Sequence, residues 1–151
     1  MHRILYTMHF IGQTSRFADR TKVLKTTGSA TSCVLSTHVL ASGLETNLKA
    51  SDGELAFMES ELRLTGPEQF EETGEITFGD ESEHMLRFST AGMGCMVPGP
   101  EPGLMTGSVS WKVEGGKGQF TDAQGFITSN FTIDESGERS DFHCGLIFVP
   151  K

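Results

Sequence analysis

Hydrophobic and polar residues alternate along much of this chain. Near the N-terminus, the apolar side chains at positions 4, 6, 8 and 10 are separated by more polar neighbours. A period of two is the spacing expected of a half-buried β-strand. Weaker strands are expected within residues 23–40, which are rich in Thr, Ser and Val. The same alternation recurs later and predicts strands within residues 74–78, 84–88, 105–113, 127–133 and 142–148.

Short polar segments separate these strands. Gly79–Glu83 and Asp134–Glu138 have the length and composition of hairpin turns. Residues 12–20 are polar and interrupt the alternation of the first strand. Met96–Gly103 contains three prolines, and proline donates no hydrogen bond to a sheet. This last segment is therefore predicted to be a stiff loop and not a central strand.

Ser51–Leu64 fits two structures. Ser51–Glu54 has the spacing of a helix capping box, and the apolar residues at 55, 58 and 62 fit a helical stripe. The apolar residues at 56, 58, 62 and 64 would equally share one face of a strand. Because the surrounding segments all read as β-structure, we favour a strand here.

The pattern predicts an all-β protein of roughly eight strands joined in sequence by short turns. A sheet of this length with one apolar face tends to close, because closure removes exposed edges. We therefore expect a closed, mainly antiparallel eight-stranded barrel that forms a single domain over residues 1–151. The interior of such a barrel holds packed side chains or one small ligand.

Composition narrows the cellular setting. Hydrophobic residues make up 36% of the chain and include eleven Phe, so a few large side chains build the core. The cysteines Cys33, Cys95 and Cys144 are odd in number and form no C-x-x-C pair, which favours reduced thiols and a cytoplasmic location. The chain shows no signal-peptide pattern and no run of about 18 apolar residues, so we expect no membrane partner.

Charge is distributed unevenly along the chain. The net charge is −8, from 12 basic and 20 acidic residues. Residues 1–49 carry six basic and two acidic residues, and residues 50–151 carry six basic and eighteen acidic residues. Two interpretations stay open, a solvated acidic surface or attraction between the two segments. A nucleic-acid partner is not expected, because no basic stripe is present to replace phosphate counterions.

Four glycines punctuate the segment Gly115–Gly125, which reads GGKGQFTDAQG. This segment resembles the G-G-x-G-x-F-x-x-A-x-G turn of allene oxide cyclase-like barrels, dirigent proteins and their uncharacterised bacterial relatives. Residues 110–114, 127–132 and 76–80 are also similar to the bacterial group. The resemblance covers residues 54–149 and does not extend to residues 1–50. It implies a closed barrel of eight mainly antiparallel strands.

The resemblance also implies control over the shape of an apolar substrate. Plant cyclases of this type close a ring on a fatty-acid epoxide, dirigent proteins steer the coupling of phenolic radicals, and some bacterial barrels fold polyketides into rings. Such barrels often form homo-oligomers, so a homo-oligomer is expected here, with the loop Pro98–Pro102 as a candidate lid or subunit contact. No catalytic residue can be transferred, because the glycine turn carries none.

Strand alternation identifies candidate site residues. It places Tyr6, His84, Trp111, Ser129 and Cys144 on apolar faces, so that a phenol, an imidazole, an indole N–H, a hydroxyl and a thiol would share the interior. A buried histidine can serve as an acid or base near neutral pH. Each residue also has a simpler interpretation. His84 follows an acidic turn and could sit at the mouth of a strand, and the others could be core or strand residues.

Two functions follow from this set of residues. The first is a module that binds a small apolar molecule in the barrel interior. The alternative is a cyclase or isomerase that works without a cofactor and in which His84 or Tyr6 moves a proton. A filled barrel that serves as an oligomeric scaffold is a third interpretation. The scattered histidines lack metal-ligand spacing, and the glycine turn lacks the Lys-Ser/Thr ending of a phosphate loop, so neither a metal nor a phosphate site is expected.

Overall fold

Strands run through nearly the whole chain. The computed structural model describes residues 1–17 and 20–151, and in these it contains eleven strands, one 3₁₀ turn (η1, Gly118–Phe120) and no α-helix. The strands are β1 His2–Phe17, β2 Arg20–Ala30, β3 Cys33–Leu40, β4 Gly43–Ala50, β5 Ala56–Leu64, β6 Gln69–Phe78, β7 His84–Thr90, β8 Gly94–Pro98, β9 Met105–Lys117, β10 Gln124–Ile133 and β11 Glu138–Val149.

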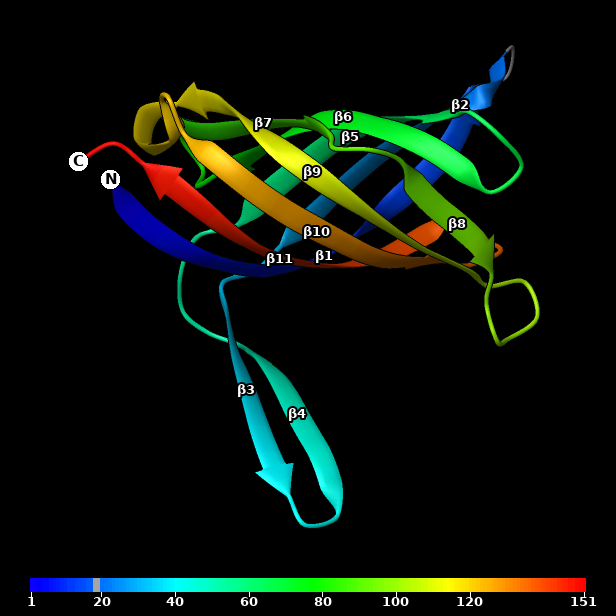
Figure 1. The fold of residues 1–151 in the computed structure, drawn as a ribbon, viewed down its shortest axis with the longest axis horizontal. Helices are drawn as coiled ribbons and strands as arrows, with labels where there is room; N and C mark the ends of the chain where they lie inside the picture. Colours follow the sequence, from blue (N-terminus) through cyan, green and yellow to red (C-terminus); the bar gives the residue numbers. More distant parts are fainter. Residues whose placement is uncertain (18–19) are drawn as a thin grey trace.

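Eight of these strands close into a barrel (Figure 1). Around the barrel they follow the order β1, β2, β5, β6, β7, β9, β10 and β11, and β11 pairs with β1 to complete the circle. Every neighbouring pair is antiparallel. The predicted fold class, a closed eight-stranded antiparallel barrel, is confirmed.

Several local predictions are also confirmed. Ala56–Leu64 is a strand, and its residues alternate between buried and exposed. The turns predicted at 79–83 and 134–138 join β6 to β7 and β10 to β11. The first strand continues to Phe17 despite its polar residues. The predicted interruption of the strand by residues 12–20 is therefore wrong for residues 12–17. Residues 18–19 lie outside the described part of the chain.

The proline-rich segment is partly a strand. β8 pairs with β9 along its length and with the beginning of β6, so the prediction of a loop from Met96 is wrong for its first residues. β8 ends at Pro98, the first of the three prolines, and the loop follows. The loop lies at the opposite end of the barrel from the chain termini (Figure 1).

β3 and β4 form a hairpin that stands away from the barrel (Figure 1). In the described part of the chain these two strands pair only with each other, while β2 pairs directly with β5. We call residues 33–50 the arm. The sequence analysis predicted weak strands within residues 23–40, which include β3, but it did not predict β4 or the separation of this hairpin from the barrel.

Large side chains fill the middle of the barrel. Trp111 is fully buried and stacks on Phe88, with 3.9 Å between the ring centroids. Gly107 lies directly opposite Phe131 on the neighbouring strand, and a side chain at Gly107 would collide with the Phe131 ring. The glycine therefore makes room for an aromatic ring inside the barrel.

The glycine-rich segment is a structural turn. β9 ends at Lys117, η1 follows, and β10 begins at Gln124. Gly118 adopts a φ of +60°, a conformation that favours glycine. The turn buries Phe120 against Phe78, with 5.0 Å between their centroids. It thus anchors one end of the barrel core.

Candidate functional site

The inner face of β11 is charged. Arg139, Asp141 and His143 occupy alternate positions, point into the barrel and are at most 2% exposed. The two residues between them, Ser140 and Phe142, lie on the outer face of the strand, and Phe142 is 51% exposed. The predicted orientation of this strand is therefore wrong. Hydrophobicity favoured the face with Phe142, but the charged face is the buried one because its charges have partners inside the barrel.

Arg139 holds this interior cluster together. Its Nη1 lies 3.1 Å from Oε2 of Glu72, and its Nη2 lies 2.8 Å from Oδ2 of Asp141. The Phe131 ring covers the guanidinium, with 4.1 Å between Cζ and the ring centroid. Two carboxylates thus face one guanidinium, and removal of the guanidinium would leave both buried without a counter-charge.

Neutral side chains also donate hydrogen bonds to the two carboxylates. The Ser60 hydroxyl donates to Oε2 of Glu72 at 2.6 Å, and the indole Nε1 of Trp111 donates to its Oε1 at 3.2 Å. The Ser129 hydroxyl donates to Oδ1 of Asp141 at 2.6 Å. The three donors lie on three different strands, β5, β9 and β10, so they position both carboxylates firmly inside the barrel.

A chain of three side chains leads from this cluster toward one end of the barrel. The Tyr6 hydroxyl lies 3.0 Å from Nδ1 of His143, and Nε2 of His143 lies 3.1 Å from Oδ2 of Asp141. The second contact has the distance of an ion pair without the alignment of a hydrogen bond. A carboxylate beside Nε2 favours the proton on that nitrogen, so Nδ1 accepts from the Tyr6 hydroxyl.

Burial and charge fix the protonation of these groups. Burial raises the pKa of Tyr6 well above its usual value, and the negative charge of Asp141 raises it further, so Tyr6 remains a phenol. Burial alone would raise the pKa of Asp141, but Arg139 and the hydrogen bonds outweigh it and hold this pKa below its usual range. Burial likewise opposes the charge of Arg139, whose pKa the carboxylates nevertheless raise.

The structure divides the five predicted site residues. Tyr6, Trp111 and Ser129 lie inside the barrel and belong to the cluster. His84 is exposed at the start of β7, where its Nδ1 accepts a hydrogen bond from the backbone N–H of Gln119 at 3.0 Å. The prediction that His84 lies in the barrel interior is therefore wrong. The alternative interpretation, a position at the mouth of a strand, is the one observed.

Cys144 is also misplaced by the sequence prediction. It is exposed on the outer face of β11, one position from His143. The sequence analysis missed Glu72 and the three ionisable residues of β11. A usable signal was present, because Arg139, Asp141 and His143 recur at the strand period with opposite charges, and such residues can neutralise one another inside a barrel.

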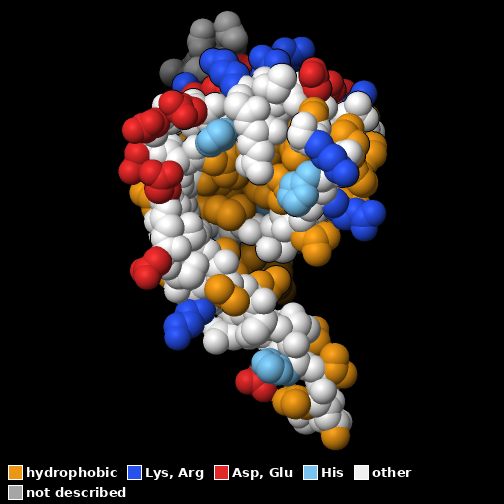
Figure 2. All heavy atoms as spheres, turned by 90° about the vertical axis from the view of Figure 1, so that its left-hand side faces the viewer, with side chains coloured by type: hydrophobic (Ala, Val, Ile, Leu, Met, Phe, Trp, Pro, Cys, Tyr) orange, Lys and Arg blue, Asp and Glu red, His pale blue; other side chains and the backbone are white. Residues whose placement is uncertain are grey.

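The barrel is hollowed at the end where β1 begins and β11 ends, which we call the hollow end. Figure 2 shows a depression there, with hydrophobic side chains on its floor and two histidine side chains at its rim. Ile4 is partly buried against the core near this end. Phe78 contacts the Phe120 ring and lies edge-on to Tyr6, with 6.3 Å between the centroids of Phe78 and Tyr6. Aromatic rings thus connect the hollow to the Tyr6–His143–Asp141 chain.

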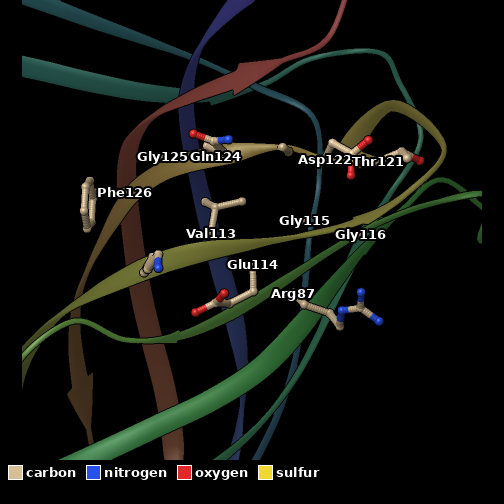
Figure 3. Close-up of a pocket in the computed structure, with 12 residues that line it drawn as sticks. Arg87, Val113, Glu114, Gly115, Gly116, Thr121, Asp122, Gln124, Gly125 and Phe126 are labelled. Atoms are coloured by element: carbon tan, nitrogen blue, oxygen red, sulfur yellow. The ribbon is translucent and has the colours of Figure 1, made fainter.

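A second hollow lies outside the barrel, beside the glycine-rich turn. This open groove of about 600 Å³ is bordered by Arg87 and Glu114 on neighbouring strands and by Thr121 and Asp122 on the turn (Figure 3). Its opposite charges are solvent-exposed, and Glu114 is bound by the hydroxyl of Ser89 at 2.7 Å. The interior cluster and the hollow end form the stronger candidate site, because their polar groups are buried and converge.

Comparisons with known proteins add no assignment. No family model, no curated protein and no solved structure matches this chain. Within residues 1–17 and 20–151, no group of three His, Cys, Asp or Glu side chains is arranged to hold a metal ion. In the same residues, no helix has the length and apolar character needed to cross a membrane.

Proposed function

We propose that this barrel binds a small apolar molecule at its hollow end, beside Tyr6. The observation that supports the proposal is the apolar depression at that end. Tyr6 occupies the next inward position of β1 after Ile4, and its hydroxyl is held by His143. Small-molecule sites are concave, mostly apolar and equipped with a few fixed polar groups. The depression is concave and has an apolar floor, and the Tyr6 hydroxyl is the fixed polar group that the proposal assigns to it.

The ligand would occupy the end of the barrel and not its middle. Trp111 and Arg139 are at most 1% exposed and fill the central layer together with Phe10 and Phe70. At the hollow end, the inward positions at the end of β2 and the start of β5 are the small residues Ala30 and Ala56. The expectation of a ligand in the barrel interior is thereby narrowed to this end.

Tyr6 favours a ligand that carries a hydroxyl group. When the Tyr6 hydroxyl donates to His143, its oxygen still has lone pairs that can accept a hydrogen bond. The raised pKa keeps Tyr6 neutral, so no charge has to be desolvated when the ligand binds. We therefore expect an apolar molecule with one hydrogen-bond donor at its buried end.

A neutral fluorescent probe tests the site. N-phenyl-1-naphthylamine brightens in apolar surroundings, and we expect the protein to bind it at the hollow end. Ile4→Trp would fill the depression and weaken binding roughly tenfold or more, which corresponds to about 1.4 kcal/mol. The matched control is Ile133→Trp, because Ile133 is also partly buried against the core but lies at the end of β10, at the opposite end of the barrel. Equal probe binding by both variants would overturn the proposal.

The alternative function is a cyclase or isomerase without a cofactor. The Tyr6–His143–Asp141 chain supports this alternative, because the Tyr6 oxygen can take a proton from a substrate as its own proton passes to Nδ1 of His143. Asp141 then faces the imidazolium, and return of the proton through Tyr6 to another atom of the substrate completes an isomerisation. The resemblance to allene oxide cyclase-like barrels points in the same direction and stays a prediction, as do a homo-oligomeric state and a cytoplasmic location.

Cyclisation and isomerisation conserve mass, which allows a direct test. An apolar cell extract is incubated with the wild type or with Tyr6→Phe. The compounds are then separated by chromatography, and their masses are measured by mass spectrometry. Isomers of unchanged mass that form only with the wild type would support catalysis. A molecule that is retained by the protein but unchanged would support binding alone.

A further inference from the structure

The arm has one uncharged face. Its register places Leu35 opposite Leu48, Thr37 opposite Thr46 and Val39 opposite Leu44, all on the same side of the hairpin. The opposite side carries the arm's charged residues, Glu45 and Lys49, and His38. That side also carries Val34 and Leu40, so the arm has one side without charge and one side that mixes charged and apolar residues.

Within residues 1–17 and 20–151, no other segment covers the uncharged face of the arm. Val39 is 85% and Leu44 is 70% exposed, and both arm strands are exposed along almost their whole length. A two-stranded hairpin alone is at best marginally stable in water, and three strands or packing against another surface are needed for stability. The arm therefore requires a second surface.

The barrel carries a matching surface. The outward positions 5–11 of β1, 126–132 of β10 and 140–146 of β11 hold no Asp, Glu, Lys or Arg, although 32 of the 151 residues are charged. We call this surface the uncharged wall. It exposes Leu5, Phe126 and Phe142, and a groove of about 460 Å³ runs beside Phe142 onto β9 and β8.

The base of the arm directs it away from its own barrel. Two residues connect β2 to β3, and the connection is fixed where the backbone N–H of Ser51 donates to the carbonyl of Ser32 at 2.8 Å. The Ser32 hydroxyl also donates to the carbonyl of Glu54 at 3.0 Å. Held in this way, the arm projects into solvent (Figure 1). A wall on another copy is the surface that it can meet without breaking these bonds.

We propose that two copies of this chain exchange arms, with the uncharged face of each arm packed on the uncharged wall of the other copy. Each arm strand of eight residues is about 27 Å long, and the pair covers a strip about 10 Å wide. Two such contacts bury about 1,000 Å² or more in total, which is the area that a specific interface needs. The dimer covers both apolar surfaces at once.

Paired variants on the arm test the contact. Leu35 and Val34 are adjacent, similarly exposed and on opposite faces of the arm. The wild type is expected to sediment as a dimer, and Leu35→Asp to dissociate it at least about 100-fold more readily, because both contacts of the dimer are lost. Val34→Asp is expected to remain a dimer.

The wall is tested in the same way. Phe142→Asp places a charge on the uncharged wall and is expected to give a monomer by sedimentation velocity. Phe57→Asp is the control, because Phe57 is a similarly exposed phenylalanine on the outer face of β5. Circular dichroism of all four variants shows whether the barrel remains folded. If Phe142→Asp does not fold, Leu5→Asp replaces it in the test, because Leu5 is an exposed residue of β1 on the same wall.

Mixing the variants separates arm exchange from other dimers. The Phe142→Asp chain keeps an intact arm and the Leu35→Asp chain keeps an intact wall. Their equimolar mixture is expected to form a heterodimer through one intact contact, which is weaker than the wild-type dimer and is measured at protein concentrations at which each variant alone is monomeric. Arms packed on arms, or walls on walls, would give no such recovery and would overturn the proposal. A monomeric wild type over roughly a hundredfold range of concentration would overturn it as well.

Discussion

β5 and β11 distribute their side chains in opposite ways. β5 turns Met58 and Leu62 into the barrel and Glu59 and Glu61 toward solvent. β11 turns Arg139 and Asp141 inward and leaves Phe142 outside. Both strands belong to the same closed barrel and have the same period. The comparison shows that alternation establishes two faces of a strand without establishing which face is buried.

Whether a charged or an apolar face of a strand is buried depends on the groups that it meets inside and outside the barrel. Charges can be buried on β11 because Glu72 and Arg139 meet across the interior, and the hydroxyl and indole groups around them complete the hydrogen bonds. Apolar residues can stay on the outer face of β11 when another surface covers them, which is what the proposed arm exchange supplies. β5 needs neither arrangement, because its inner face is mainly apolar and its outer face carries Glu59, Glu61 and Arg63 beside a single exposed Phe57.

The largest expected effect comes from a substitution on the inner face of β11. Arg139→Met would leave two buried carboxylates without their counter-charge and destabilise the fold by about 3–5 kcal/mol. Arg63→Met on the outer face of β5 is the matched change and is expected to alter stability by about 0.5 kcal/mol or less. Urea unfolding monitored by circular dichroism measures both, and similar losses in the two variants would contradict the comparison.

A smaller effect appears in acid. The lowered pKa of Asp141 means that the folded protein binds its proton less readily than the unfolded chain, whose pKa is about 3.9. The stability that the carboxylate contributes is therefore present above about pH 4 and is lost as the pH falls through the lower pKa of the folded state. Unfolding of the wild type and of Asp141→Asn across this range is expected to show the difference between them shrinking with acid. A constant difference would mean that Asp141 is not held ionised by Arg139.

The smallest effect concerns the outer face of β11. In a background without Cys33 and Cys95, a maleimide reagent is expected to label Cys144 in the folded protein, because this thiol is exposed. Met58→Cys in the same background adds a thiol to the buried face of β5 and is expected to add no label until the protein unfolds. Protection of Cys144 in a monomeric variant such as Leu35→Asp would show that β11 faces the other way.

The sequence alone predicts much of the barrel. Alternation identifies most strands, the polar turns end them where predicted, and Pro98 ends β8 because proline donates no bond to a neighbouring strand. These features are local, since each depends on residues that lie close together in the chain. The sequence also supplies Tyr6, Trp111 and Ser129 as interior candidates by parity.

Only the tertiary structure decides the orientation of β11, the projection of the arm and the assembly of the polar cluster. Tyr6 and His143 are 137 positions apart, and Glu72 and Arg139 are 67 apart, so no local pattern brings them together. β2 pairs with β5, so the arm strands between them in sequence pair only with each other and lie outside the barrel. A strand's period belongs to its own residues, whereas the burial of a face depends on which distant groups can neutralise or cover it.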